Sequence, residues 1–129
     1  ILKGVMTVDE ALLAAEAGVD AIVVSNHGGR VLDFAPGAAD VLEAIADAVK
    51  DKVTILADGG VRSGGDVLKL LALGADAVMI GRPISVAAVG GLQQGVESYL
   101  SQIKGELIQS MVLTGTTSTS MVSKDILHA

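Results

Sequence analysis

The sequence contains no cysteine and no tryptophan, and it has only one phenylalanine, Phe34, and one tyrosine, Tyr99. Without cysteine the chain has no disulfide, no thiol nucleophile and no thiolate metal ligand, and we expect no metal site. The absence of disulfides fits a reducing compartment, so we expect a cytoplasmic protein. The scarcity of aromatic side chains excludes the stacking platform on which single-stranded nucleic acids bind.

Positive charge and long apolar runs are also scarce. The 129 residues carry a formal net charge of -6 at pH 7. That charge disfavours binding to nucleic acids and to anionic membranes. No run reaches the roughly 18 apolar residues of a membrane-spanning helix, and residues 1–4 lack the pattern of a signal peptide. We therefore expect one domain over residues 1–129, with no membrane segment and no nucleic-acid partner.

The abundant residues are mostly Ala, Val, Leu and Ile. They form short apolar runs that alternate along the chain with longer segments. Short β-branched runs predict buried strands over residues 1–5, 20–24, 53–57 and 76–80. Apolar residues at helical spacing predict helices over residues 8–17, 38–50, 66–73 and 96–113. A further helical region after Pro83 should break near Gly90, and residues 123–127 predict a last short turn. This alternation predicts an α/β fold with a parallel sheet covered on both faces.

The predicted elements contain a weak internal repeat. Residues 17–25 and 73–81 share a helix end, a glycine, an Asp-Ala pair, a buried strand and a polar turn. The chain holds about three and a half strand–helix units, whereas a complete (β/α)8 barrel needs at least about 200 residues. The chain is therefore half of such a barrel or a doubly wound open sheet, and the usual Gly-x-Gly-x-x-Gly turn of the open sheet is absent.

The stretch from Ser25 to Arg30 is the densest group of polar chemistry in the chain. It reads Ser-Asn-His-Gly-Gly-Arg and follows the buried run that ends at Val24. Sites of parallel α/β folds lie at this end of the strands. His27 could act as a base near neutral pH, and Arg30 could hold a carboxylate. The alternative is a structural histidine beside a solvated arginine.

Two further turns combine glycine with arginine. Residues 58–65 read Asp-Gly-Gly-Val-Arg-Ser-Gly-Gly, and residues 81–83 read Gly-Arg-Pro. Glycines between a strand and a helix let backbone N–H groups approach an anion, and Arg62 and Arg82 add forked donors that suit phosphate. The alternative is a pair of ordinary turns with solvated arginines. Lys3, at the end of the first strand, is by itself the weaker candidate.

These motifs resemble those of the FMN-dependent α-hydroxy acid oxidases and dehydrogenases, which include glycolate oxidase, lactate oxidase and flavin-type lactate dehydrogenase. The resemblance covers the chain from Leu2 to about Gly115. The Asp-Gly-Gly and Gly-Arg-Pro turns are shared with other FMN or phosphate barrels, so the Ser-Asn-His-Gly-Gly-Arg stretch is the discriminating one. The resemblance implies the C-terminal half of a (β/α)8 TIM barrel, FMN as cofactor, and a small 2-hydroxy acid that is oxidised to a 2-oxo acid.

The resemblance also implies a role for each motif residue. Lys3 would lie at the edge of the flavin ring and stabilise its reduced, anionic form, and Ser25 would touch the flavin. His27 would take a proton from the substrate, and Arg30 would hold its carboxylate. The ribityl chain and phosphate of FMN would be held by Asp58, Gly59, Gly60, Arg62, Gly81 and Arg82.

The first strands of the family's complete barrel have no counterpart in this sequence. In the family they supply tyrosines for the substrate carboxylate, polar groups on the flavin ring, and an aspartate that orients the histidine. An open half barrel has unpaired strand edges, which predicts pairing with the missing N-terminal half or formation of a homo-oligomer. Two alternatives to an enzyme stay open: a module that binds FMN or phosphate without turnover, and a self-associating chain.

Overall fold

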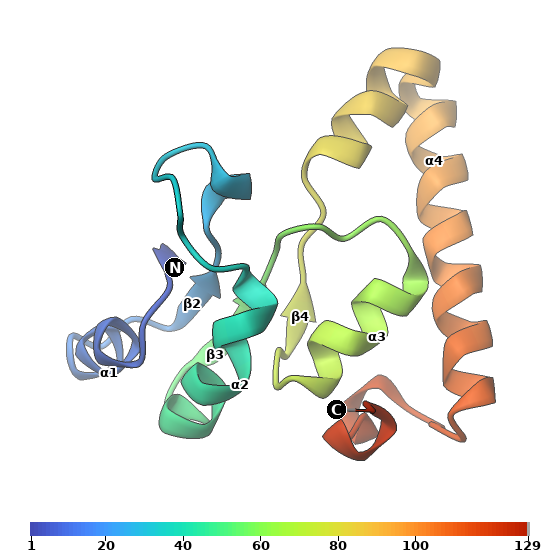
Figure 1. Ribbon diagram of the computed structural model, residues 1–129. Helices are drawn as coiled ribbons and strands as arrows, with labels where there is room; N and C mark the ends of the chain where they lie inside the picture. The colour runs from blue at the N-terminus through green and yellow to red at the C-terminus, as the bar shows by residue number, and fades with distance from the viewer. Residues whose placement is uncertain (129) are drawn as a thin grey trace.

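A computed structural model describes residues 1–128 as one parallel sheet with helices packed around it (Figure 1). The strands are β1 (Leu2–Val5), β2 (Ala21–Val24), β3 (Thr54–Ala57) and β4 (Ala77–Val78). The helices are α1 (Val8–Glu16), α2 (Ala38–Val49), α3 (Gly64–Ala72) and α4 (Arg82–Leu113), and short 3-10 turns lie at His27–Gly29, Thr119–Met121 and Lys124–Ile126. The predicted α/β alternation is confirmed.

The strands lie in sequence order, β1-β2-β3-β4, and all neighbours are parallel. β2 and β3 pair from Ala21 with Thr54 to Val24 with Ala57, so both strands end at the same level. β4 is shorter than the predicted strand over residues 76–80. It pairs with one neighbour only, and after Met79 the chain leaves the sheet for α4, so few residues remain in the ladder.

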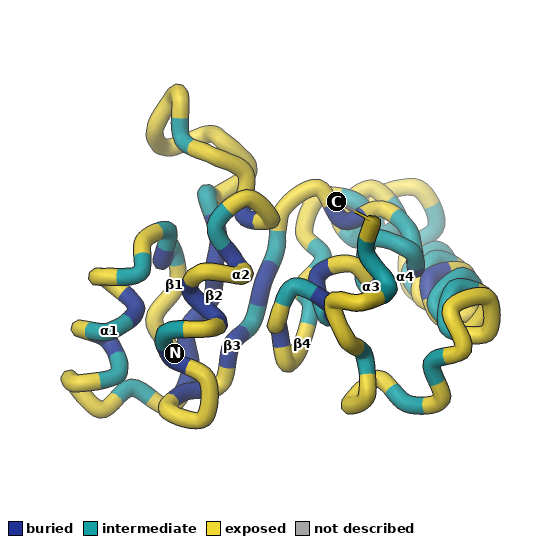
Figure 2. Tube along the Cα trace, turned by 60° about the horizontal axis from the view of Figure 1, so that its bottom comes forward, coloured by how far each residue is buried: buried dark blue, intermediate teal, exposed yellow. Residues whose placement is uncertain are grey.

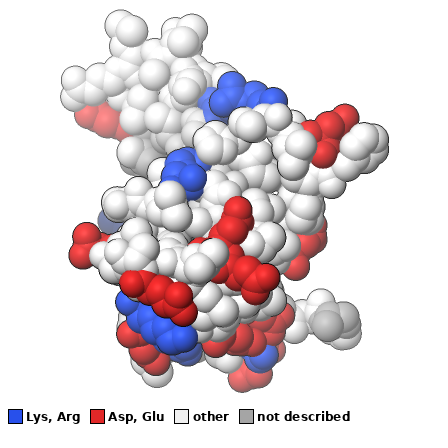
Figure 3. All heavy atoms as spheres, turned by 90° about the vertical axis from the view of Figure 1, so that its left-hand side faces the viewer, with Lys and Arg blue, Asp and Glu red and all other residues white. Residues whose placement is uncertain are grey.

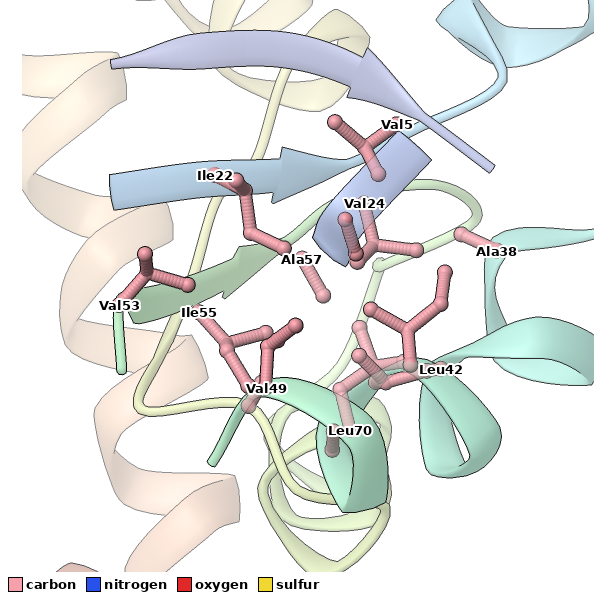
Figure 4. Close-up of a cluster of buried hydrophobic side chains, with 14 of the residues drawn as sticks. Val5, Ile22, Val24, Ala38, Leu42, Val49, Val53, Ile55, Ala57 and Leu70 are labelled. Carbon is pink, nitrogen blue, oxygen red and sulfur yellow. The ribbon is translucent and has the colours of Figure 1, made fainter. Parts of the chain in front are cut away.

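The core lies between the sheet and α2. Ile22 and Val24 of β2 and Ile55 of β3 point toward Leu42 and Val49 of α2, and all five are at most 2% exposed (Figure 4). Figure 2 shows how burial varies along the chain: the central strands are buried, whereas the loop after β2 is exposed.

The prediction that both faces of the sheet are covered fails at the two edge strands, β1 and β4. Leu2 of β1 is 45% exposed, Ala77 of β4 is exposed, and Met79 just beyond β4 is 38% exposed. The sheet has no further strand beyond these edges in the part of the chain that is described. The sequence pattern of a buried strand is thus met in full only by β2, whose four residues are all buried.

The internal repeat is realised as two strand–helix–strand units with the same helix signals. Thr7 caps α1 in a capping box with Glu10, and Ser63 caps α3 in the same way with Asp66. Because Ser63 is the cap, α3 begins at Gly64 and not at the predicted residue 66.

α4 extends along α3 and is broken where the sequence predicted a break. The backbone leaves helical geometry at Gly91 and at Leu92, whose φ of 49° is rare for a residue with a side chain. After α4 the chain turns back, and Lys124 Nζ forms an ion pair with Glu43 Oε1 of α2 at 2.9 Å. Within residues 1–128 no helix is long and apolar enough to span a membrane. The cytoplasmic location stays a prediction.

Candidate active site

The C-terminal ends of the four strands surround a cavity of about 450 Å3. β1 contributes Lys3, and the segment after β2 contributes His27 and Arg30. Residues 58–62 after β3 and residues 79–83 after β4 complete the lining. Parallel strands that lie side by side end at one edge of a sheet, which is why residues so far apart in the sequence meet here.

The structure brings together nearly all the residues that the sequence singled out. The cavity is lined by Lys3, His27, Arg30, Asp58, Gly59, Gly60, Arg62, Gly81 and Arg82. Ser25 is the exception, because it is 1% exposed and contacts a lining residue without lining the cavity itself. In Figure 3 acidic side chains gather over the lower part of the visible face, interspersed with lysine or arginine side chains, while the upper part also carries lysine or arginine side chains but fewer acidic ones.

Lys3 is held in place by residues from two other strand ends. Its Nζ forms an ion pair with Asp58 Oδ2 at 2.8 Å and donates a hydrogen bond to Ser25 Oγ at 2.7 Å. The positions of the partners follow from the sheet register: Ser25 and Asp58 each come directly after the paired residues Val24 and Ala57. A partly buried ammonium group is thus fixed between a carboxylate and a hydroxyl group.

His27 lies in a tight turn made of three consecutive residues with positive φ: 56° for His27, 68° for Gly28 and 72° for Gly29. Asn26 closes this turn, since its Oδ1 accepts hydrogen bonds from the backbone N–H groups of Gly28 and Gly29 at 2.9 and 3.3 Å. The turn leaves the His27 imidazole exposed at the cavity and next to Gly4, where an added Cβ would lie 3.5 Å from His27 Cε1.

The Arg82 guanidinium group lies against Gly28, although the two residues belong to different strand ends. A Cβ added to Gly28 would lie 2.9 Å from Arg82 Nη2, so a side chain at this position would displace the arginine. Arg30 is exposed and donates from Nε to the His27 carbonyl at 3.4 Å. The glycine at position 28 therefore has two effects: it allows the positive φ of the turn, and it leaves room for the Arg82 guanidinium group.

The turn after β3 presents backbone to the cavity. Gly60 has a φ of 72°, and an added Cβ there would have no heavy atom within 4 Å. Arg62 Nη1 donates to the Gly60 carbonyl at 3.0 Å, which keeps this guanidinium group beside the turn. The equivalent position after β4, Gly81, is likewise open.

Three supporting residues were missed by the sequence reasoning. Asn26 holds the histidine turn, and its own Nδ2 donates to the Pro36 carbonyl at 3.0 Å. Tyr99 of α4 donates from its hydroxyl to the Arg62 carbonyl at 3.3 Å. Glu106 of α4 accepts at Oε2 from the Gly64 N–H at 2.8 Å. Only Asn26 could have been found from the sequence, by its place in the polar stretch.

Two carboxylates fix the start of α3 beside the cavity. Burial raises the pKa of Asp66, but hydrogen bonds from the Arg62 N–H and from the hydroxyl and N–H of Ser63 outweigh it, so the pKa lies below its usual value of 3.8. The pKa of Glu106 is also lowered, first by the hydrogen bond from the Gln102 side chain and then by that from Gly64. Both groups therefore stay charged at neutral pH and anchor the turn that carries Arg62.

The residues present fit a flavin mononucleotide. Arg62 and Arg82 offer forked donors for a phosphate, and the open backbone at Gly60 and Gly81 lets N–H groups approach it. Lys3 offers a fixed positive charge of the kind that stabilises an electron-rich ring. Within residues 1–128 no group of three or more His, Asp or Glu side chains is placed to hold a metal ion.

Comparison with known proteins agrees with this arrangement. The family model described as FMN-dependent dehydrogenase matches residues 1–129, and the chain belongs to that family. L-lactate dehydrogenases from Xanthomonas campestris pv. campestris and Xanthomonas oryzae pv. oryzae are each 50% identical to it over 127 residues. Each match covers 98% of this chain and 33% of the relative, so the chain spans about a third of the length of these relatives.

Solved structures show the same relation in three dimensions. The chain superposes on mandelate oxidase with benzoyl-formic acid at a TM-score of 0.92 and 45% identity, covering 94% of this chain and 36% of the oxidase. A mandelate oxidase variant with a monooxide FMN adduct gives the same TM-score and identity and is covered to 38%. The family resemblance seen in the sequence is confirmed, and so is the prediction of half of a TIM barrel.

Proposed function

We propose that this chain carries the phosphate-binding and base-bearing side of an FMN-dependent enzyme that oxidises a small 2-hydroxy acid to the 2-oxo acid. The observation that supports the proposal is one cavity that His27 and Arg30 line together with Lys3, Arg62 and Arg82. A base, a carboxylate clamp and a set of cations suited to a flavin phosphate are the groups that this reaction requires.

In this proposal the turns after β3 and β4 hold the cofactor. Arg62, Gly81 and Arg82 bind the phosphate, and Asp58 with Gly59 and Gly60 binds the ribityl chain. Lys3 lies at the edge of the flavin ring, and Ser25, which does not line the cavity, holds the Lys3 ammonium group from behind. Two features support these roles: the Lys3 ammonium group is fixed by its ion pair with Asp58, and the backbone at Gly60 and Gly81 is open.

Oxidation removes one proton and one hydrogen with its electron pair from the substrate. FMN, when bound, supplies the acceptor for the hydrogen at C2 and that electron pair. An imidazole nitrogen of His27 takes the proton of the C2 hydroxyl, so that the C–O bond becomes a carbonyl. Arg30 holds the carboxylate through its forked donors and thereby directs the hydroxyl toward His27.

The names of the relatives support a substrate that is an acid with a hydroxyl next to the carboxylate. The similar curated proteins are named L-lactate dehydrogenases, and the similar solved structures are of a mandelate oxidase. We therefore propose lactate or a close homologue, such as glycolate, as the substrate class.

An FMN titration of the purified chain, followed by absorbance and fluorescence, tests the proposal. We expect saturable binding with a perturbed flavin spectrum, followed by bleaching of the bound flavin when lactate is added without oxygen. Flavin that binds but does not bleach with lactate, glycolate or mandelate would support a module that binds FMN without turnover. The absence of any binding would contradict the cofactor site itself.

Matched variants separate the roles of the residues. Arg62→Ala and Arg82→Ala should each weaken FMN binding by about tenfold or more, the value of a lost charged hydrogen bond. Arg30→Ala removes the same charge from the same cavity and should leave FMN affinity within about threefold while abolishing bleaching. His27→Ala should behave like Arg30→Ala, and bleaching that survives in it would contradict the assignment of the base.

We also propose that the open sheet edges of this half barrel are covered by further protein. Leu2 of β1 and Met79 just beyond β4 are exposed apolar residues at the two edges. The partner that fits is the remaining part of a barrel or a second copy of this chain, because unpaired strand edges and apolar flanks favour association.

A further inference from the structure

Among residues 1–128, Ser25 is the one polar side chain that is buried, with 1% of its surface exposed. Its Oγ accepts two hydrogen bonds, from Lys3 Nζ at 2.7 Å and from the backbone N–H of His27 at 3.2 Å. A serine hydroxyl has two acceptor positions and one donor. Both acceptor positions are therefore in use, and only the hydroxyl hydrogen remains for a third group.

The two hydrogen-bond donors, Lys3 and His27, belong to the two parts of the proposed site, which bind the flavin and the substrate. Lys3 also contacts Asp58, so a continuous path of contacts runs from the end of β3 through Lys3 and Ser25 to the backbone of His27. His27 needs such an anchor, because its φ of 56° is a backbone conformation that residues with side chains rarely adopt. The N–H that Ser25 holds belongs to this same residue.

The sheet register shows that a strand end of this kind does not need a serine to fold. Asp58 directly after β3 and Met79 directly after β4 lie at the level that Ser25 occupies after β2, and neither is a serine. The serine is found at the strand end that faces a lysine and precedes a histidine turn. The hydroxyl group of Ser25 is thus explained by its contacts with Lys3 and His27 and not by a requirement of the sheet itself.

We propose that Ser25 is a positioning residue, which sets the Lys3 ammonium and the His27 turn in one fixed relation. The inference rests on the proposed function, in which Lys3 faces the flavin and His27 faces the substrate. Ser25 then acts through its acceptor oxygen, and any contact of its hydroxyl hydrogen with the flavin is secondary. Loss of the oxygen should disturb both the lysine and the histidine.

The first test uses the chain without cofactor, so it does not depend on flavin binding. Ser25→Ala removes the oxygen, Ser25→Cys keeps a side chain of similar size with a poor acceptor, and Ser25→Thr keeps the hydroxyl. The chain has only two histidines, His27 and His128, so NMR signals of the two imidazoles are easily assigned. Hydrogen exchange of the His27 amide and the shift of its imidazole signal are the readouts.

We expect exchange of the His27 amide to become about tenfold faster in the Ala and Cys variants, in line with the loss of one hydrogen bond. The His27 imidazole signal should move in both variants, while that of His128 stays in place. Ser25→Thr should restore the exchange rate to within about threefold. If the extra methyl group unfolds the Thr variant, the comparison of Ser with Cys still decides the question. Unchanged exchange and an unchanged His27 signal in Ser25→Cys would overturn the proposal.

A second test asks whether Ser25 acts through Lys3. FMN affinity is measured for Ser25→Ala, for Lys3→Met and for the double variant. Each single change should weaken binding by about tenfold, and the double variant should be within about threefold of Lys3→Met, because residues that share a contact are not additive. Fully additive losses would mean that Ser25 binds the flavin independently, which contradicts the proposal. A native chain that binds no FMN would contradict the proposed function and leave the NMR result to decide the role of Ser25.

Discussion

At the scale of single residues, the candidate site depends on a backbone turn that few residue types can form. His27, Gly28 and Gly29 all have positive φ. A residue with a side chain pays about 1–2 kcal/mol for this conformation. Two of the three positions are glycine, which adopts a positive φ without strain. The third is His27, the proposed base, so the backbone strain falls on the residue that is proposed to carry out the chemistry.

Gly28→Ala and Gly29→Ala form a matched pair that separates backbone strain from the contact with Arg82. Their φ values differ little, so each change should lower the free energy of unfolding by about 1–2 kcal/mol. Only at Gly28 would the new Cβ meet Arg82, 2.9 Å from Nη2, whereas at Gly29 it meets nothing within 4 Å. We expect FMN affinity to fall about tenfold in Gly28→Ala and to change little in Gly29→Ala. Equal affinities in an FMN titration would show that the position of Arg82 does not matter for the cofactor.

At the scale of elements, the turns that carry the site are held by the helices that follow them. Ser63 and Asp66 form a capping box at the start of α3, and Asp66 Oδ2 also accepts from the Arg62 N–H at 3.1 Å. The start of α3 and the arginine turn are therefore one structural unit. The same kind of box starts α1, with Thr7 and Glu10.

Asp66→Ala should destabilise the chain by about 1 kcal/mol at pH 7, the typical value of a lost helix cap. The pKa of Asp66 is lowered in the folded state from its usual value of 3.8, so its contribution to stability is present above that value. The contribution is lost as the pH falls through the lower, folded-state pKa. Urea unfolding at pH 7 and near pH 3 should show a difference between native chain and variant that shrinks in acid. Asp9→Ala, an exposed first-turn aspartate of α1 outside its capping box, is the control. A difference that is the same at both pH values would contradict this account.

α3 and α4 pack so closely that a glycine is required between them. A Cβ added to Gly64 would overlap the backbone of Glu106 and Leu107, whereas one added to Gly65 would have its nearest neighbours at 3.7 Å. Gly64→Ala should therefore destabilise the chain by about 1–3 kcal/mol. Gly65→Ala should be neutral or stabilise it by up to about 1 kcal/mol, because alanine favours a helix over glycine. Urea unfolding checks both, and a stable Gly64→Ala variant would contradict the packing of α4 on α3.

At the scale of the whole molecule, the sheet formed by residues 1–128 has two edges without a neighbouring strand. The order β1-β2-β3-β4 leaves β1 and β4 with one neighbour each. The cavity lies at the ends of all four strands, so both edge strands contribute to its lining: Lys3 comes from β1, and residues 79–83 follow β4. Association is therefore expected to affect both stability and cofactor binding.

Sedimentation of the chain over a range of concentrations tests this expectation. We expect a species larger than a monomer, and we expect Leu2→Lys to weaken the association by at least about tenfold, since a charge would be buried at the edge of β1. Val112→Lys on α4 adds the same charge at a position that is 73% exposed and serves as the control. A monomer at all concentrations, or equal effects of the two changes, would contradict association through β1.

Much of the fold and most of the site could be predicted from the sequence because the signals are local. The glycines, aspartates and capping residues of the repeat mark where each strand and helix begins and ends, and residues after a strand must lie at its end. The predictions failed where neighbours decide the outcome. β4 is short because the chain leaves the sheet for α4 after Met79, and the edge strands are partly exposed because, within residues 1–128, no further strand pairs with them.

The sequence by itself determined the alternation of strands and helices, the polar strand ends and the family to which they belong. Only the tertiary structure decided which polar groups meet: Lys3 with Asp58 and Ser25, Arg82 with Gly28, and Glu106 with Gly64. The reason is physical. Secondary structure follows from local preferences and spacing, whereas contacts between distant residues follow from sheet register and helix packing, which no short stretch of the chain contains.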